Sequence, residues 1–119
     1  MTNSANCSTQ REKSAAALVS ELDSTFFKTL SEPVRIELLK FLMLHGSSDI
    51  GTISENMPQD RSVISRHLNL MLSSGLVSSE KQGRHTFYDV DSQFFLTKFE
   101  SIAEQIRVCM KEFGIPVSK

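Results

Sequence analysis

The chain has 119 residues, enough for one modest hydrophobic core but too few for two independent domains. Its 13 Lys and Arg residues nearly balance 14 Asp and Glu residues, and the formal net charge of -1 excludes a strongly basic protein that coats nucleic acid without selectivity. No stretch approaches the roughly 20 apolar residues that cross a bilayer, so no membrane partner is expected.

The N-terminal segment MTNSANCSTQREK is polar. We expect a disordered tail over residues 1–12, followed by one folded domain over residues 13–115. The segment has neither an apolar run nor a small-residue cleavage pattern, so a secretory signal is not expected. The sequence therefore predicts a cytoplasmic protein whose two cysteines stay reduced.

Two helices are predicted before residue 46. Apolar residues recur every three or four positions from about Arg11 to Leu30, and again from Glu32 to about His45. Ser31 is the expected N-cap of the second helix, with Pro33 in its tolerant first turn. Gly46 is expected to end that helix, because glycine commonly follows a helix C-terminus.

Residues 49–57 and 61–74 predict two shorter helices joined by a turn. Asp49 and Asp60 are the expected N-caps, and Pro58 cannot continue the first helix. The second helix is expected to bury Ile64, Leu68 and Met71. Its opposite face carries guanidinium, hydroxyl and amide groups, which can bond base edges and phosphates. The predicted DNA-binding residues of this helix are Arg61, Ser62, Ser65, Arg66, His67 and Asn69.

A β-hairpin is predicted next, with strands over Leu76–Gln82 and His85–Asp91. The pair Gly83-Arg84 between them suits a type II′ turn. From Gln59 to His85, four basic and two acidic residues leave a charge of +2 before histidines are counted. The positive residues at the tip are predicted to touch phosphates or enter a minor groove, and they are Lys81, Arg84 and His85.

The last predicted helix runs from about Ser92 to Phe113, and its apolar residues follow a 3.5-residue repeat. Such a seam exposes more apolar surface than one small domain covers, so we expect it to pair with a second copy. The expected dimer interface comprises Leu18, Leu22, Phe95, Phe99, Ile102, Ile106, Cys109 and Phe113. A two-fold dimer would place two DNA-reading helices about 34 Å apart on a pseudo-palindromic site.

The chain resembles the ArsR/SmtB family of bacterial winged-helix repressors. Three segments in the right order carry the resemblance: FFKTLSEPVRIELLKFL (Phe26 to Leu42), VISRHL (Val63 to Leu68) and GLVSSEKQGRHTFYDV (Gly75 to Val90). It implies a mostly α fold with a small β-hairpin, a winged helix-turn-helix of order α-α-α-α-β-β-α, and a homodimer through the N- and C-terminal helices. It also implies that four residues face DNA, namely Arg61, Ser62, Ser65 and Arg66.

In that family, inducers are commonly metal ions or thiol-reactive species held by clustered Cys, His, Asp or Glu. Residues 49–57 contain no Cys, and the last helix lacks the spaced Asp and His pairs of metal-sensing relatives, so we expect no metal site and no cofactor. Cys7 and Cys109 remain as an alternative thiol or soft-metal site. In the competing interpretation, Cys109 is an apolar seam residue and Cys7 an incidental thiol.

Two function classes stay open. The first is a sequence-specific DNA-binding transcription regulator, a repressor that binds double-stranded DNA as a homodimer. Whether a thiol-reactive or soft-metal inducer releases this repressor from DNA stays open. The second is a winged-helix module for protein interaction without operator binding. The polar helix face lacks the central aromatic or aliphatic anchor of most protein interfaces, which favours the first class. No enzyme is expected, because no His and carboxylate are placed to activate a serine.

Overall fold

The computed structural model describes the backbone of residues 2–116 and the side chains of residues 9–116. Its contacts divide the chain into two compact units. Unit 1 comprises Met1–Ser24 and Leu96–Lys119, and unit 2 comprises Thr25–Phe95. Among the helices of the described residues, we find none with both the length and the apolar character that a membrane span requires.

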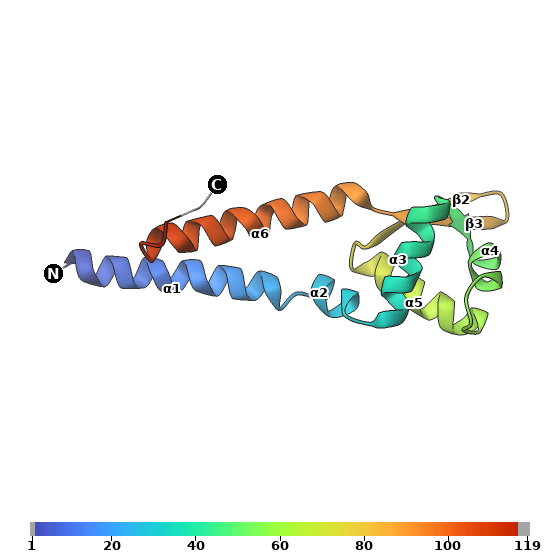
Figure 1. The fold of residues 1–119 in the computed structure, drawn as a ribbon, viewed down its shortest axis with the longest axis horizontal. Helices are drawn as coiled ribbons and strands as arrows, with labels where there is room; N and C mark the ends of the chain where they lie inside the picture. The colour runs from blue at the N-terminus through green and yellow to red at the C-terminus, as the bar shows by residue number, and fades with distance from the viewer. Residues whose placement is uncertain (1, 117–119) are drawn as a thin grey trace. The chain divides into compact units, whose positions relative to one another are not determined.

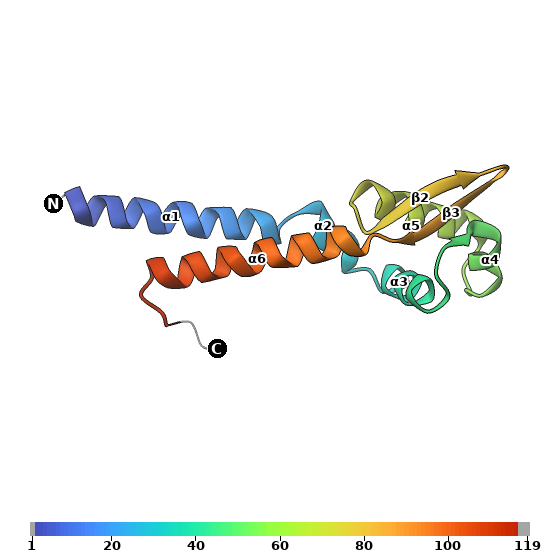
Figure 2. The ribbon, with the colours of Figure 1, turned by 90° about the horizontal axis from the view of Figure 1, so that it is seen from above.

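Unit 1 is a pair of long helices, α1 (Thr2–Leu22) and the greater part of α6 (Ser92–Glu112). They run side by side in opposite directions (Figures 1 and 2). Ile102, on α6, is 6% exposed, and the Lys98 ammonium forms an ion pair with Glu21 on α1. Unit 1 therefore has one buried apolar side chain among its described residues and an ion pair that links its two helices.

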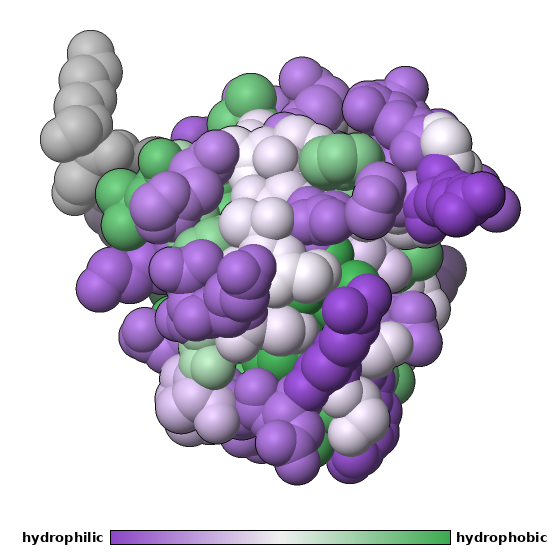
Figure 3. Space-filling view, turned by 90° about the vertical axis from the view of Figure 1, so that its right-hand side faces the viewer, coloured by the Kyte–Doolittle hydropathy of each residue, from purple (hydrophilic) through white to green (hydrophobic). Residues whose placement is uncertain are grey.

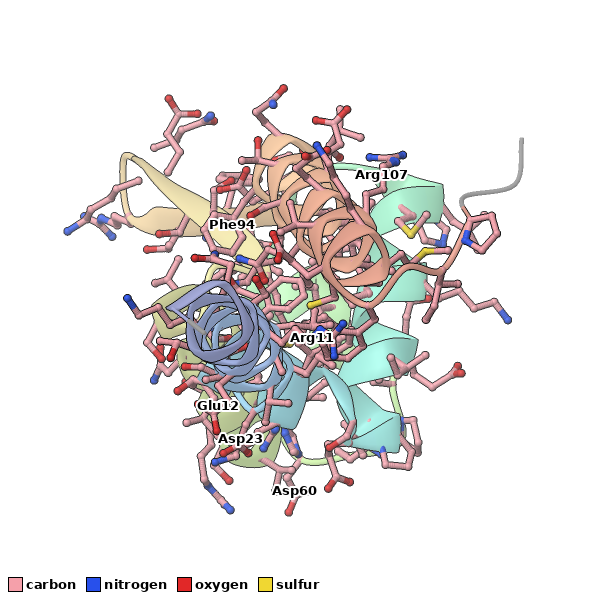
Figure 4. The ribbon with its side chains drawn as sticks, turned by 90° about the vertical axis from the view of Figure 1, so that its left-hand side faces the viewer. Arg11, Glu12, Asp23, Asp60, Phe94 and Arg107 are labelled. Carbon is pink, nitrogen blue, oxygen red and sulfur yellow. The ribbon has the colours of Figure 1, made fainter. Side chains whose placement is uncertain are left out.

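Polar contacts also tie the far ends of the two helices together. Arg11 Nε donates to the Glu112 carbonyl oxygen at 3.0 Å, and the Arg11 guanidinium lies 5.8 Å from the centre of the Phe113 ring. Figure 4 shows Arg11 between α1 and α6, whereas Glu12 and Arg107 point away from the pair. A cation over an aromatic face adds a modest stabilisation at an exposed site.

The single helix predicted from Arg11 to Leu30 is wrong, because the structure divides this stretch into α1 and α2 (Thr25–Leu30). The interruption falls at Asp23 and Ser24, whose short polar side chains compete with the helical backbone for hydrogen bonds. Helical spacing of apolar residues continues across these two positions, so periodicity alone does not detect the break.

The N-terminal boundary also differs from the prediction. Residues 2–12 belong to α1, where the sequence indicated a disordered tail over residues 1–12. The first 32 residues contain neither proline nor glycine, so no strong helix breaker separates the polar segment from the helix that follows. The single domain expected over residues 13–115 stays a prediction, because the division into two units does not test it.

Unit 2 contains four helices before its hairpin. They are α2, α3 (Pro33–His45), α4 (Ile50–Glu55) and α5 (Arg61–Ser73). The strands of this unit are β1 (Ser48–Asp49), β2 (Val77–Gln82) and β3 (His85–Val90). This order confirms the predicted winged helix-turn-helix, with one short strand that the sequence analysis did not anticipate.

The core of unit 2 is closed within a single chain. The residues at 0 to 2% exposure are Leu38, Leu42, Ile53, Ile64, Leu68, Met71, Leu76 and Val77. They come from α3, α4, α5, the start of β2 and Leu76 just before it, so burying them holds the helix-turn-helix against the hairpin. Full burial of each such side chain contributes about 1.5–3 kcal/mol. Ile64, Leu68 and Met71, predicted from their spacing, all lie in this core.

Helix α3 begins one residue later than predicted. Glu32 is its N-cap and Pro33 its first residue, while the Ser31 hydroxyl donates instead to the Lys28 carbonyl at 2.8 Å. Ser31 is therefore not the cap, because its hydroxyl is engaged by the preceding turn. Gly46, at φ 78°, ends the helix as expected and donates its amide to Leu42.

Helix α5 ends in a Schellman motif at Gly75. The Gly75 amide donates to Leu72 at 3.3 Å, and the Leu76 amide donates to Met71 at 2.9 Å. Gly75 has φ 88°, and a Cβ there would lie 2.5 Å from the Phe94 ring. Both the backbone and the aromatic neighbour therefore require glycine at this position.

The sheet has the order β1-β3-β2 and is antiparallel throughout. In the hairpin, Val77 faces Val90 and Gln82 faces His85, close to the predicted register. Strand β1 adds the pairs Ser48 with Tyr88 and Asp49 with Phe87. A two-residue strand is too short to produce a periodic pattern, so only the tertiary pairing reveals it.

Candidate nucleic-acid interface

Helix α5 presents the polar face that the sequence predicted. Arg61, Ser62, Arg66 and Asn69 are exposed, and Ser65 is half-buried. Asp60 occupies the N-cap position with extended backbone, although its side chain makes no capping hydrogen bond. The face stays outward because the residues on the other side of the helix are anchored in the core of unit 2.

The hairpin forms a short, positively charged wing. Gly83 has φ 65° and Arg84 does not have a positive φ, as a type II′ turn requires. Lys81, Arg84 and His85 are exposed around this turn. The tip therefore combines an ammonium group, a guanidinium group and an imidazole ring.

A groove of about 600 Å³ lies between α5 and the wing. Its lining residues are Asp49, Ile50, Arg61, Ser62, Ser65, Arg84, His85, Thr86 and Tyr88. On the face of the molecule shown in Figure 3, hydrophilic residues surround only a few apolar ones. The groove brings five predicted site residues together, whereas Arg66, Asn69 and Lys81 are exposed outside its lining.

His67 lies on a different side of α5 from the polar face. The Arg35 Nε donates to His67 Nδ1 at 3.1 Å, and an Arg35 terminal nitrogen donates to the Thr29 carbonyl at 3.0 Å. Burial lowers the pKa of His67, and the neighbouring guanidinium groups of Arg35 and Arg66 lower it further. His67 is therefore a neutral acceptor that links α3 to α5, and its predicted contact with DNA has no geometric support here.

Asp49 contributes to the groove, and the sequence analysis had treated it only as a helix cap. Its Oδ1 accepts from the Thr52 amide at 3.0 Å, and its Oδ2 lies 3.2 Å from His85 Nδ1. The hydrogen bond from Thr52 is the main reason that the pKa of Asp49 is lowered, so this carboxylate is ionised at neutral pH. The groove thus contains one fixed negative charge beside the wing histidine.

Three other groove residues were missed: Ile50, Thr86 and Tyr88. Tyr88 and Thr86 lie on the same face of β3, and β1 pairs with that strand at Tyr88. The alternation of β3 indicated one shared face, but the sequence contained no sign of which strand or helix would pack beside it.

The predicted dimer residues are placed unevenly. Leu22, Phe99, Ile106 and Phe113 are 42 to 49% exposed, and Leu18 and Cys109 are half-buried. Ile102 is buried inside unit 1, and Phe95 packs against the core of unit 2 with its ring 5.2 Å from that of Phe26. A two-fold dimer interface would therefore use the exposed residues of the predicted interface, and it would not use Ile102 or Phe95.

Within the described residues, Cys109 is a half-buried free thiol, and no three His, Cys, Asp or Glu side chains gather as a metal site. The side chain of Cys7 lies outside the described residues. The predicted thiol pair of Cys7 and Cys109 therefore stays a prediction.

A recognition-type helix flanked by a charged β-hairpin defines the winged helix-turn-helix class. Residues 32–79 match the family described as "Bacterial regulatory protein, arsR family". HTH-type transcriptional regulator MJ1325 of Methanocaldococcus jannaschii is 32% identical over 68 residues, which cover 57% of this chain and 76% of that protein. The chain belongs to the arsR family of transcriptional regulators and is a DNA-binding regulator, not an enzyme.

Further relatives and structures agree with this assignment. The arsenical resistance operon repressor of Bacillus subtilis is 27% identical over 67 residues, which cover 56% of this chain and 64% of that protein. An ArsR-like transcriptional regulator from Rhodococcus sp. RHA1 superposes with a TM-score of 0.63 at 26% identity, covering 82% of this chain and 95% of its own.

The homodimeric winged helix-turn-helix DNA-binding domain Mb0332 of Mycobacterium bovis has the same fold. It superposes with a TM-score of 0.58 at 22% identity, covering 82% of this chain and 84% of its own. At this level of identity the likeness concerns the fold alone.

Proposed function

We propose that the chain is a cytoplasmic repressor that binds a pseudo-palindromic operator as a homodimer. The observation that carries the proposal is the groove between α5 and the wing, where Arg61 and Arg84 lie with the hydroxyls of Ser62 and Ser65. Guanidinium groups form hydrogen bonds with guanine edges and with phosphates, and hydroxyl groups form hydrogen bonds with base edges or phosphates. Arg66 and Asn69, which are exposed on α5, add a further guanidinium group and an amide to these polar groups.

The exposed apolar residues of unit 1 support the homodimer. Leu22, Phe99, Ile106 and Phe113 would leave a large apolar surface in water, and a second copy of the same surface covers it with closed symmetry. A two-fold axis through these helices would set two copies of α5 about one DNA turn, roughly 34 Å, apart. The homodimer named for the Mycobacterium bovis domain is consistent with this arrangement.

The proposal is tested by measuring how protein variants with single substitutions bind to two DNA duplexes. Arg66→Ala should weaken binding to a fragment of the protein's own promoter region by about 1–3 kcal/mol and change random DNA much less, because it removes a base contact. Lys81→Ala, in the wing, should weaken both duplexes alike and reduce the salt dependence. Equal losses on both duplexes for Arg66→Ala would contradict the placement of α5 in the major groove.

The alternative, a protein-interaction module, predicts no salt-steep binding to either duplex. The thiol prediction is tested in the same assay by adding arsenite, copper or a mild oxidant to the reduced protein. Release that persists in the Cys7→Ser and Cys109→Ser variants would eliminate a thiol site.

A further inference from the structure

We propose that Arg35 is a positioning residue for operator recognition, which holds α5 at the orientation that presents its polar face to DNA. This inference rests on the proposed function, since it concerns how α5 reads a base sequence. Arg35 lies on α3 and is half-buried. Its guanidinium donates from Nε to His67 Nδ1 on α5 at 3.1 Å, and from a terminal nitrogen to the Thr29 carbonyl of α2 at 3.0 Å. One side chain therefore joins three helices of unit 2.

The end of α2 needs a hydrogen-bond donor from a side chain. Thr29 lies in the last turn of this helix and is 5% exposed. The carbonyls of a last turn have no partner within their own helix, and a buried carbonyl without a partner is costly. The residue four positions later is Pro33, which has no N–H to donate. The Arg35 guanidinium therefore supplies the hydrogen bond that the backbone cannot, and this bond fixes one side of the guanidinium.

The same guanidinium holds α5 through His67. His67 is half-buried and follows Ile64 by about one turn, beside the buried residues of α5. The ring accepts at Nδ1, so the hydrogen of the neutral imidazole resides on Nε2. Burial lowers the pKa of His67, and the guanidinium groups of Arg35 and Arg66 lower it further, so the ring remains a neutral acceptor at neutral pH.

A directed bond adds a constraint that the core contacts of α5 lack. The buried side chains of α5 make apolar contacts, which have no preferred direction and permit small rotations of the helix about its axis. A hydrogen bond weakens steeply when its geometry is bent, so the bond from Arg35 resists such rotation. Base-reading side chains must stay within about 0.5 Å and 10–20° of the productive geometry. Arg66 is next to His67 in the chain, so its placement depends on this bond.

The test measures the ratio between the affinity for the promoter fragment and the affinity for random DNA. Arg35→Met keeps an unbranched apolar stem but removes both hydrogen bonds, so the ratio should fall about three- to tenfold through weaker binding to the promoter fragment. Affinity for random DNA should change less than about twofold, because phosphate contacts carry no sequence information. Lys40→Met is the matched control, since it removes an exposed cation from the same helix and should leave the ratio unchanged.

Substitutions of His67 separate the hydrogen bond from the bulk of the ring. His67→Asn keeps an acceptor at nearly the position of Nδ1 and has a similar helix propensity, so the ratio should stay within about twofold of the wild type. His67→Leu removes the acceptor and should lower the ratio by about as much as Arg35→Met. Equal ratios in His67→Asn and His67→Leu would overturn the inference, because the acceptor would then have no effect.

The double variant with Arg35→Met and His67→Leu tests whether the two residues act through one link. Its ratio should be no lower than that of Arg35→Met alone, because both substitutions break the same hydrogen bond. Losses that multiply would overturn the inference. Nitrogen NMR of the free protein at about pH 8 gives a second readout. The hydrogen of His67 should reside on Nε2 in the wild type and redistribute between the two nitrogens in Arg35→Met, and an unchanged distribution would contradict the proposed link.

The affinity ratio also separates positioning from charge and from stability. If Arg35 acts only through its positive charge, Arg35→Met weakens binding to both duplexes equally and reduces the salt dependence, which would overturn the inference. Circular dichroism and urea titration identify conditions in which every variant is fully folded. If Arg35 only stabilises the fold, Arg35→Met keeps the wild-type ratio under those conditions, and this result would also overturn the inference.

The inference and the proposed function fail in different ways. A wild-type chain that binds no duplex would overturn the proposed function and, with it, the role of Arg35 in DNA binding. Wild-type binding with an unchanged ratio in Arg35→Met would overturn the inference alone.

Discussion

The two units of this chain bury apolar surface to very different extents. Unit 2 encloses eight side chains at 2% exposure or less, whereas the buried apolar side chain of unit 1 among the described residues is Ile102. Val19, Leu22 and Phe99 in unit 1 remain 47 to 61% exposed. Residues 25–95 therefore bury their apolar side chains within a single chain, whereas the helix pair leaves an apolar face exposed.

The largest expected effect tests whether unit 2 is self-contained. Leu68→Ala removes a side chain at 0% exposure from the centre of α5, so it loses transfer free energy and leaves a cavity. The free energy of unfolding should fall by about 2–5 kcal/mol in urea titrations. The loss should be the same at low and high protein concentration if the core belongs to one chain. A loss that grows on dilution would show that this core depends on the partner.

Gly75→Ala should have the next largest effect. The left-handed backbone at φ 88° disfavours alanine, and the added methyl group would meet the Phe94 ring at 2.5 Å. We expect a loss of about 1–3 kcal/mol in the free energy of unfolding. Gly46→Ala is the matched control, because Gly46 has a similar φ of 78° but nothing within 4 Å of its Cβ position. Equal losses for both variants would mean that the Phe94 contact costs nothing.

A smaller effect tests the exposed face of unit 1. Ile106→Ser replaces an apolar side chain that is 42% exposed, so the dimer dissociation constant should rise about tenfold, or about 1.4 kcal/mol. Met43→Ser makes a comparable change on α3 in unit 2, where the side chain is 74% exposed. Sedimentation equilibrium should show weaker association only for Ile106→Ser. If Met43→Ser weakens association as much, the interface is not confined to unit 1.

The smallest expected effect concerns the polar link between α3 and α5. The pKa of His67 is lowered from 6.5 in the folded chain, chiefly by burial, so the unfolded chain takes up a proton more readily. The resulting stability is present above pH 6.5 and is lost as the pH falls through the lowered folded pKa.

His67→Gln removes this titration and keeps an acceptor for Arg35. Its melting temperature should therefore change less than that of the wild type between about pH 7 and about pH 5, by a few degrees at most. His45→Gln, at the exposed end of α3, is the matched control and should retain the wild-type slope. If the melting temperature of His67→Gln changes with pH as steeply as that of the wild type, folding does not lower the pKa of His67.

Local patterns in the sequence predicted most of unit 2. The spacing of Ile64, Leu68 and Met71 identified the buried side of α5, and the pair Gly83-Arg84 identified the hairpin turn with its register. The cap at Asp49 and the end of α3 at Gly46 were also confirmed. Each of these features depends on neighbours within about one helical turn or one hairpin, which is why residue order alone contains them.

Other features depended on contacts between residues far apart in the chain. The break between α1 and α2 left the apolar spacing intact, and the two-residue strand β1 exists only through its pairing with β3. His67 accepts a hydrogen bond from Arg35, 32 positions away in the chain, and its contact with DNA stays a prediction. Sequence spacing shows which side of a helix a residue occupies, but it does not show which other element covers that side.

By itself, the sequence determined the class of this protein, the polar face of α5 and the charged wing, because these follow from periodicity, caps and turn residues. The tertiary structure alone decided that Asp49 meets His85 beside Arg61 and that Ile102 and Phe95 are already covered within the chain. The physical reason is that a pairing between side chains distant in sequence is set by how sheets and helices pack in three dimensions, which no local pattern specifies.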